Sequence, residues 1–136
     1  MPIVVDTSVT MAWCFEDEAT DKTDSVLDLL RDDEAVVPAL WQLEVTNVLL
    51  VAERRGRITE AQSTRFLDLL TQLRIRIDMS QTNVNALLAT GNRHQLSAYD
   101  ATYLLLAERI AAPLATLDGN LIAAARTAGV ELAIAL

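Results

Sequence analysis

Residues 2–8 read Pro2-Ile3-Val4-Val5-Asp6-Thr7-Ser8, and their order predicts the architecture of the chain. The Ile and Val residues follow one another without the polar alternation of a half-exposed strand. Such a run is typical of a strand that is buried on both faces, as in a parallel sheet. Asp6 ends the run, and Thr7 and Ser8 after it are also residues that favour helix N-termini. The stretch therefore predicts a core strand that delivers an acidic side chain to one edge of the sheet.

The rest of the chain alternates short β-branched runs with longer helical patterns, as expected for an α/β protein with a parallel sheet. Further strands are predicted at residues 35–37, 74–79, 114–117 and 130–135. Helices are predicted from about Val9 and at residues 21–31, 38–55, 59–73, 80–90, 99–110 and 121–128, with a loop at 91–95. We expect a three-layer α/β/α sandwich with a central five-stranded parallel sheet, forming a single domain over residues 1–136.

The composition is that of a globular protein, because 51% of the 136 residues are hydrophobic. No apolar run approaches the roughly 18 residues of a membrane span. Asp6 would fall inside the core of a signal peptide, so we expect a cytoplasmic protein without a membrane partner. The single cysteine, Cys14, excludes an internal disulfide and suits a reducing compartment. We expect Cys14 to be a small buried side chain rather than a nucleophile.

The net charge of −8 argues at first against a nucleic-acid substrate, because phosphate backbones are bound mainly through Lys and Arg. The charge is unevenly distributed, however. Residues 1–53 hold two basic and twelve acidic side chains, whereas residues 54–126 hold nine arginines and six acids. The arginine-rich part could contact phosphates or an acidic segment of a partner protein, and charge alone does not separate these possibilities.

Four acidic residues lie where this fold would collect its functional groups: Asp6, Glu44, Asp100 and Asp118. The carboxyl ends of parallel strands share one edge, where open α/β folds usually bind ligands. Asp6 and Asp118 each end a predicted strand. Glu44 lies two turns into the helix that leaves the second strand, and Asp100 lies in the first turn of the helix that returns to the fourth. All four carboxylates are therefore expected to converge.

Each acid also has an ordinary structural explanation. Asp6 and Asp118 could simply cap helices, and Asp100 would fit a capping box with Ser97. Taken singly, this explanation is favoured for these three residues. Glu44 is different, because it interrupts a helix that is apolar on nearly every side, and an unpaired buried carboxylate is costly. Asn47, one turn further on, is a polar companion for it.

Four converging carboxylates would need a compensating charge. Two carboxylates about 4 Å apart repel by roughly 4 kcal/mol at an effective dielectric constant near 20. A divalent cation offsets this repulsion, and oxygen ligands suit Mg²⁺ or Mn²⁺ rather than zinc. His94 lies in a predicted loop and is expected to be solvated. The predicted metal ligands and catalytic residues are thus Asp6, Glu44, Asp100 and Asp118. The side chains predicted to orient these carboxylates or water, unless they only cap helices, are Thr7, Ser8, Asn47 and Thr116.

The sequence around these residues resembles the PIN domain family, and its size and motifs are similar to those of VapC toxins from bacterial toxin–antitoxin pairs. The motifs that carry the resemblance are Val4-Val5-Asp6-Thr7-Ser8, Leu43-Glu44-Val45-Thr46-Asn47, Leu96-Ser97-Ala98-Tyr99-Asp100 and Thr116-Leu117-Asp118-Gly119-Asn120. They occur in the family's order and span nearly the whole chain. The resemblance implies a five-stranded parallel sheet between helices, a homodimer, metal-dependent endoribonuclease activity and inhibition by a cognate antitoxin protein.

We therefore expect hydrolysis of RNA phosphodiesters that depends on Mg²⁺ or Mn²⁺. Asp6, Asp100 and Asp118 would hold the main ion, and Glu44 with Asp100 would orient a second ion or the attacking water. A non-catalytic PIN-like RNA-binding module and a DNA-directed nuclease remain alternatives. A phosphatase or phosphoacceptor domain is disfavoured, because Ser8 stands where such a phosphatase needs a second Asp. The only lysine, Lys22, lies in the acidic region.

A homodimer is also predicted from the hydrophobic pattern. The helix at residues 40–52 is apolar on nearly every face, and the helix at 59–73 adds further leucines and Phe66. A helix that is apolar all round is normally buried, so we expect these helices to pair with a second copy of the chain. The arginines that outnumber nearby acids, and could meet an antitoxin, are Arg54, Arg55, Arg57, Arg74 and Arg76.

Overall fold

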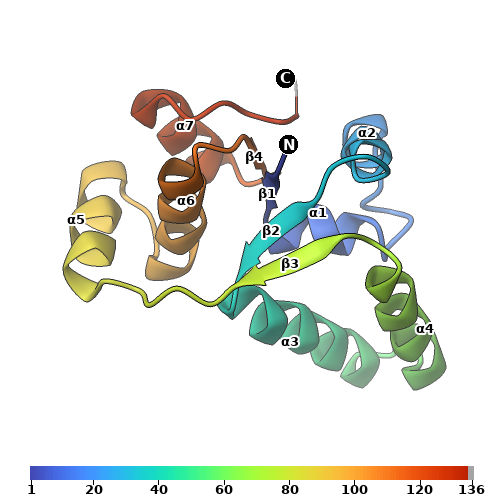
Figure 1. Cartoon of the computed structure of the whole chain (residues 1–136). Helices are drawn as coiled ribbons and strands as arrows, with labels where there is room; N and C mark the ends of the chain where they lie inside the picture. The colour runs from blue at the N-terminus through green and yellow to red at the C-terminus, as the bar shows by residue number, and fades with distance from the viewer. Residues whose placement is uncertain (135–136) are drawn as a thin grey trace.

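The computed structural model describes residues 1–134 and has a sheet of four parallel strands in the order β3-β2-β1-β4 (Figure 1). The strands are β1 (Ile3–Val5), β2 (Ala35–Pro38), β3 (Ile75–Asp78) and β4 (Leu114–Ala115). Val4 of β1 pairs with Val36 on one side and with Leu114 on the other. The first strand is therefore central, and all three of its residues are buried, as its sequence predicts.

The predicted fifth strand at residues 130–135 is not a strand in the described part of the chain. Leu132 forms only an isolated parallel bridge with Leu114. The hydrogen bonds of this bridge run from the Leu114 amide to the carbonyl of Glu131 and from the Ala133 amide to the carbonyl of Leu114, both 2.8 Å long. Because β4 is only two residues long, it offers no further backbone groups for pairing. The last predicted residue of this strand, Ala135, lies outside the described residues.

Seven helices are present in residues 1–134, at positions close to those predicted. They are α1 (Thr7–Ala12), α2 (Asp21–Leu29), α3 (Leu40–Arg54), α4 (Glu60–Thr71), α5 (Val84–His94), α6 (Ala98–Ile110) and α7 (Gly119–Ala128).

The main error concerns α5, which was predicted at residues 80–90 and followed by a loop. Asn83, not Ser80, caps this helix, because its side chain accepts a hydrogen bond from the Ala86 amide (3.1 Å). The Ser80 hydroxyl instead donates to Asp78. The helix continues through the predicted loop and includes His94 as its last residue.

Helices cover both faces of the sheet, because the side chains of β1 alternate between two hydrophobic clusters. Ile3 and Val5 pack in one cluster with Val26 of α2. Val4 packs in the other cluster with Leu104 of α6 and Leu121 of α7. Figure 1 shows α5, α6 and α7 on one side of the sheet and α1 and α2 on the other. The three-layer α/β/α arrangement is thus confirmed, with four strands in place of five.

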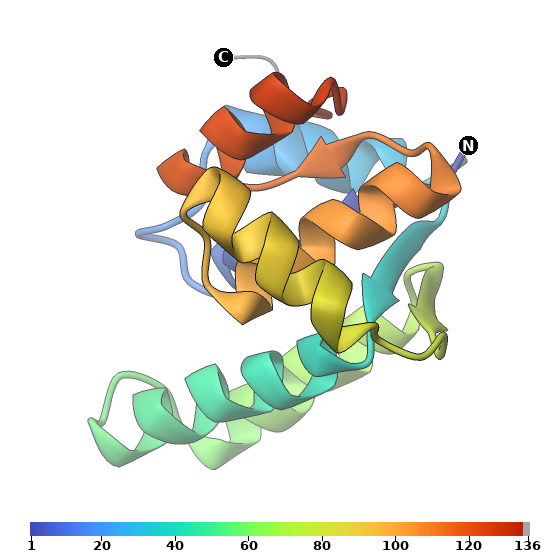
Figure 2. The same ribbon diagram turned by 90° about the vertical axis from the view of Figure 1, so that its left-hand side faces the viewer.

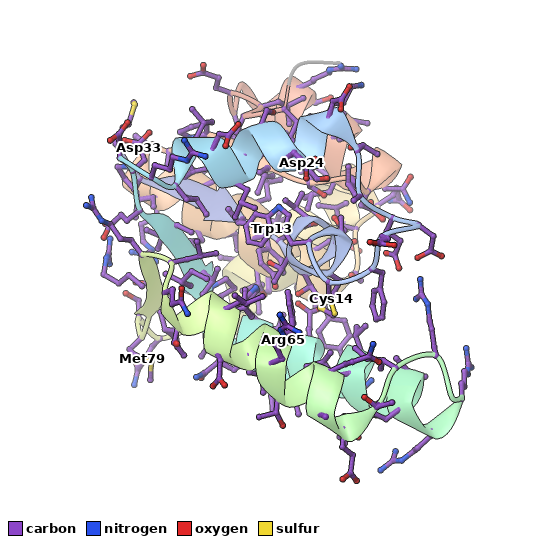
Figure 3. All side chains as sticks on the ribbon, turned by 90° about the vertical axis from the view of Figure 1, so that its right-hand side faces the viewer. Trp13, Cys14, Asp24, Asp33, Arg65 and Met79 are labelled. Atoms are coloured by element: carbon purple, nitrogen blue, oxygen red, sulfur yellow. The ribbon has the colours of Figure 1, made fainter. Side chains whose placement is uncertain are left out.

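Helices α3 and α4 lie beside one another at the β2–β3 end of the molecule. Figure 3 shows α4, which carries Arg65, in front of α3, and shows Trp13 and Cys14 near the end of α1. The apolar residues of α3 and α4 that are buried against this chain's own core are Trp41, Val45, Leu49, Ala52, Phe66 and Leu70. The chain itself therefore covers part of the surface that was predicted to pair with a second copy, whereas Leu43, Leu50, Leu67 and Leu69 of these helices remain exposed. Within residues 1–134, no helix has the length and hydrophobicity of a membrane span.

Most of the arginines that were expected to outnumber their acidic neighbours form ion pairs or hydrogen bonds within the chain. Arg57 contacts the carboxylates of Asp17 (2.7 Å) and Glu18 (2.9 Å). Arg76 pairs with Glu34 (3.2 Å), and Arg74 donates to a backbone carbonyl. The expectation of unpaired arginines is therefore wrong for Arg57 and Arg76.

Candidate active site

Asp6 is the most buried of the four predicted acids, with 4% of its surface exposed. Its Oδ1 accepts hydrogen bonds from the Ser8 hydroxyl (2.6 Å) and the Val9 amide (3.1 Å). Its Oδ2 accepts from the Thr116 hydroxyl (2.5 Å). Burial raises the pKa of Asp6 to about 6, and the charge of Asp100 acts in the same direction, although the three hydrogen bonds oppose the rise. Asp6 thus caps α1 and also lies at the centre of a polar cluster.

Ser8, in the first turn of α1, and Thr116 connect the end of β1 to the loop after β4. The Ser8 oxygen accepts a hydrogen bond from the Leu117 amide (2.9 Å), and the Thr116 oxygen accepts one from the Asp118 amide (3.0 Å). From β1 the chain continues to β2 on one side, and it later returns to β4 on the other side of β1. The strand order therefore reverses between β1 and β4. Such a switch point is where open parallel sheets usually bind ligands.

Glu44 is held by two hydroxyl groups from other elements. Its Oε1 accepts hydrogen bonds from Tyr103 Oη (2.6 Å) and from Thr7 Oγ1 (3.0 Å). These two hydroxyl oxygens are themselves 2.9 Å apart. Burial, followed by the hydrogen bond to Glu44, raises the pKa of the Tyr103 phenol, so the phenol remains protonated and able to donate.

Asp100 and Asp118 face the same region from α6 and from the loop before α7. Asp118 Oδ1 caps α7 by accepting a hydrogen bond from the Leu121 amide (2.9 Å). The Asp100 amide donates to the hydroxyl of Ser97, the N-cap of α6 (3.1 Å). Burial raises the pKa of the Asp100 carboxyl, and the negative charges of Asp118 and Glu44 raise it further. The four predicted acids therefore influence one another electrostatically across the carboxyl end of the sheet.

The structure adds one residue to the predicted site and leaves one outside it. Tyr103 was not predicted, although it lies three residues after Asp100, a spacing that places both on one side of a helix. Asn47 was predicted to orient Glu44 or water. It is exposed and forms no side-chain hydrogen bond within residues 1–134. The polar companions of Glu44 are Thr7 and Tyr103 instead.

The donor atoms at this edge fit a hard divalent cation in their chemistry. Glu44 Oε2 and Asp118 Oδ2 accept no hydrogen bond from the described residues, so each is available as an oxygen ligand. A positive charge would also offset the effect by which neighbouring carboxylates raise the pKa values of Asp6 and Asp100. The side chains are nevertheless apart in this structure, since no group of three or more Asp, Glu, His or Cys among the described residues could hold a metal ion as placed.

Comparison with known proteins places this arrangement in a family. The PIN domain family profile matches residues 3–127. A curated relative named Ribonuclease VapC3, from Pyrobaculum aerophilum, is 27% identical over 123 residues, which cover 89% of this chain and 92% of the relative.

Solved structures show the same fold. The crystal structure of PAE2754 from Pyrobaculum aerophilum superposes with a TM-score of 0.70 at 22% identity, covering 91% of this chain and 84% of that one. A chain of a toxin–antitoxin complex from Klebsiella pneumoniae superposes with a TM-score of 0.60 at 16% identity, covering 87% of both chains. At these identities the structures establish the fold alone. Since the family profile spans nearly the whole sequence, the resemblance inferred from the four motifs is confirmed, and the chain belongs to the PIN domain family.

Proposed function

We propose that this protein is a nuclease that hydrolyses RNA phosphodiesters in the presence of Mg²⁺ or Mn²⁺. The observation that carries the proposal is that Asp6, Glu44, Asp100 and Asp118 all lie toward one end of a parallel sheet, close enough for Asp100 to be affected by the charges of Asp118 and Glu44 and for Asp6 to be affected by that of Asp100. The similarity to a protein named a ribonuclease supports RNA as the substrate. We also propose that residues 1–136 form one functional domain.

The roles proposed for the acids are those inferred from the sequence. Asp6, Asp100 and Asp118 would hold the principal ion, and Glu44 would bind a second ion or orient the attacking water. A bound divalent ion supplies a Lewis acid for the phosphate oxygens and lowers the pKa of water. The hydrogen bonds from Ser8 and Thr116 fix the direction of the Asp6 carboxylate.

The direct test is incubation of a total RNA pool with the purified protein, followed by mapping of the cut ends. Cleavage should require Mg²⁺ or Mn²⁺ and stop with a chelator. Asp6→Asn and Asp100→Asn should abolish it, whereas Asp68→Asn, an exposed acid of α4, serves as the matched control. Wild-type cleavage by either site variant would contradict the assignment. Cleavage of DNA but not RNA, or RNA binding without cleavage, would favour one of the two alternative functions.

We further propose that the protein is the toxin of a type II toxin–antitoxin pair and that a cognate antitoxin protein inhibits it. A fold shared with a chain of a toxin–antitoxin complex supports this proposal. A groove of about 460 Å³ lies between α5, α6 and the start of α3, lined in part by Leu40, Leu87 and Leu105. Because α3 and α6 also carry Glu44 and Asp100, an apolar segment seated there could place a basic side chain among the carboxylates.

Expression in a bacterial host tests the toxin proposal. The wild type should arrest growth, and growth should return with Asp6→Asn or with co-expression of the neighbouring gene. Harmless expression of a wild type that cuts RNA would contradict this proposal without affecting the proposed nuclease activity.

A further inference from the structure

The contacts around Glu44 form a closed triangle of three oxygen atoms from three helices. Glu44 Oε1 of α3, Tyr103 Oη of α6 and Thr7 Oγ1 of α1 are separated by 2.6, 2.9 and 3.0 Å. When Glu44 is ionised, the triangle contains only two protons, one on each hydroxyl group. Three contacts share these protons, and the shortest contact joins Tyr103 to the carboxylate. The Tyr103 hydroxyl is therefore the main donor to Oε1.

Tyr103 is a rigid support for this carboxylate. Only 1% of its surface is exposed, and its side chain belongs to the main hydrophobic cluster, together with Leu104 of the same helix. The surrounding core therefore fixes the position of its hydroxyl group. Glu44, in contrast, is a half-buried side chain with three rotatable bonds, and it would sample several orientations without such an anchor.

The triangle also distinguishes the two oxygens of Glu44. Oε1 accepts both hydroxyl donors, whereas Oε2 accepts no hydrogen bond from residues 1–134. The partners that orient a ligating carboxylate usually matter nearly as much as the ligand itself. A fixed Oε1 thus leaves a single oxygen of known direction for a cation or for water.

We propose that Tyr103 is a positioning residue that, together with Thr7, holds Oε1 of Glu44 so that Oε2 is the oxygen presented to the divalent ion and the attacking water. This inference rests on the proposed nuclease function, because that function gives Glu44 its role. Tyr103 acts through Glu44 and contacts neither the RNA nor the ion.

The chain offers a matched test, because its only other tyrosine, Tyr99, lies one turn earlier on the same helix and is exposed. Tyr103→Phe and Tyr99→Phe each remove one hydroxyl group and keep the ring. Mn²⁺ affinity, measured by calorimetry with the metal alone, should fall about 10-fold in Tyr103→Phe, at the lower end of the usual effect of such partners. Tyr99→Phe should bind Mn²⁺ as the wild type does. With RNA, Tyr103→Phe should lower kcat and leave KM unchanged.

Thr7 provides a second test that does not alter the core. Thr7→Val removes the second donor to Oε1 and should also weaken Mn²⁺ binding, whereas Thr7→Ser restores a hydroxyl group and should recover most of the affinity. Wild-type Mn²⁺ affinity and kcat in Tyr103→Phe would overturn the inference and leave the proposed function intact. A raised KM with unchanged kcat would also overturn it, because Tyr103 would then act on RNA directly. If the wild type neither binds Mn²⁺ nor cuts RNA, the proposed function fails and the inference fails with it.

Discussion

The contacts of Asp6 suit both a helix cap and a carboxylate that is held in place to bind a metal ion. Asp6 accepts a hydrogen bond from the Val9 amide in the first turn of α1. The Ser8 and Thr116 hydroxyls also donate to the carboxylate and hold it in place. Three donor atoms are thus arranged around one buried negative charge, with no cation beside it among the described residues. The folded protein therefore keeps this carboxylate in an environment that favours its protonated form.

This environment predicts how stability depends on pH in the absence of metal. The pKa of Asp6 is about 6 in the folded protein, against an ordinary value of 3.8 for an aspartate in the unfolded chain. Because the folded state binds the proton more tightly, the favourable contribution is complete below about pH 4 and is lost as the pH rises to about 6. The difference corresponds to about 3 kcal/mol.

Urea unfolding with a chelator should therefore show the free energy of unfolding decreasing between pH 4 and pH 7. The decrease should be smaller in Asp6→Asn, which cannot ionise, and unchanged in Asp68→Asn. An equal decrease in wild type and Asp6→Asn would show that the carboxylate is not the source.

A divalent cation should reverse this destabilisation at neutral pH. A ligand present at about 100 times its Kd stabilises the folded state by about 2.7 kcal/mol, and here it would also relieve repulsion among the acids. We expect Mn²⁺ to raise the thermal midpoint of the wild type at pH 7 and to have little effect on Asp6→Asn or Asp100→Asn. A similar rise in all three proteins would place the bound ion elsewhere.

The placement of Asp6, Asp100 and Asp118 near one edge of the sheet could be predicted from sequence, because each lies at the end of a strand or the start of a helix, whereas the roles of the four acids remain a prediction. The predicted contact between Asn47 and Glu44 is not present among the described residues. The buried face of α3 is defined by Trp41, Val45 and Leu49, and the spacing of Asn47 from Glu44 did not show that its side chain lies on the solvent side. Tyr103 could not be assigned to Glu44, because the two are 59 residues apart and their contact depends on how α3 and α6 pack.

At the scale of elements, a strand or helix end was predictable where the sequence held a single clear capping or terminating residue. Thr59 forms the capping box at the start of α4, and Gly56 adopts the positive φ of 71° that follows the end of α3. The start of α5 was harder, because Ser80 and Asn83 are both good N-cap residues. A local hydrogen bond engages Ser80 instead, since its hydroxyl donates to Asp78 at the end of β3.

The two candidate caps give a prediction for α5. Asn83→Ala should destabilise the helix by about 1 kcal/mol, because the Ala86 amide loses its acceptor. Ser80→Ala should have a smaller effect, since its bond to Asp78 is exposed. Amide hydrogen exchange of α5 measures both, and it also detects local unfolding of a helix with no fully buried residue. Faster exchange in Ser80→Ala than in Asn83→Ala would contradict the observed helix start.

At the scale of the whole molecule, pairing within the chain removes much of the basic surface that the sequence suggested. Arg57 and Arg76 are neutralised by acids that are 40 and 42 residues away along the chain. Arg109 pairs with Asp78 at the groove beside α6. Simple counts of charge over sequence segments could not reveal the pairs of Arg57 and Arg76, because these join the acidic first part of the chain to the arginine-rich part.

The proposed homodimer is the last property that depends on the whole molecule. On α3 and α4, the core buries Trp41, Val45, Phe66 and Leu70 but leaves Leu43 and Leu69 exposed by 73 and 53%; the segment around α5 leaves Met79, Val84 and Leu88 exposed by 77, 75 and 66%. Figure 2 shows α5 as the outermost helix on its side, lying over α6, and Figure 3 shows Met79 at the periphery. An amphipathic helix with no fully buried residue is therefore a second candidate for pairing, beside the exposed leucines of α3 and α4.

We therefore expect light scattering at micromolar concentration to give twice the mass of one chain. Leu88→Glu on α5 should give the monomer mass, because a symmetric contact would bring this charge into the interface from both copies. Leu69→Glu is the matched control, since Leu69 is an exposed leucine of α4 (53%) on the surface predicted from the sequence. Loss of the dimer in Leu69→Glu, but not in Leu88→Glu, would show that the dimer contact lies on α3 and α4. A monomeric wild type would exclude the dimer altogether.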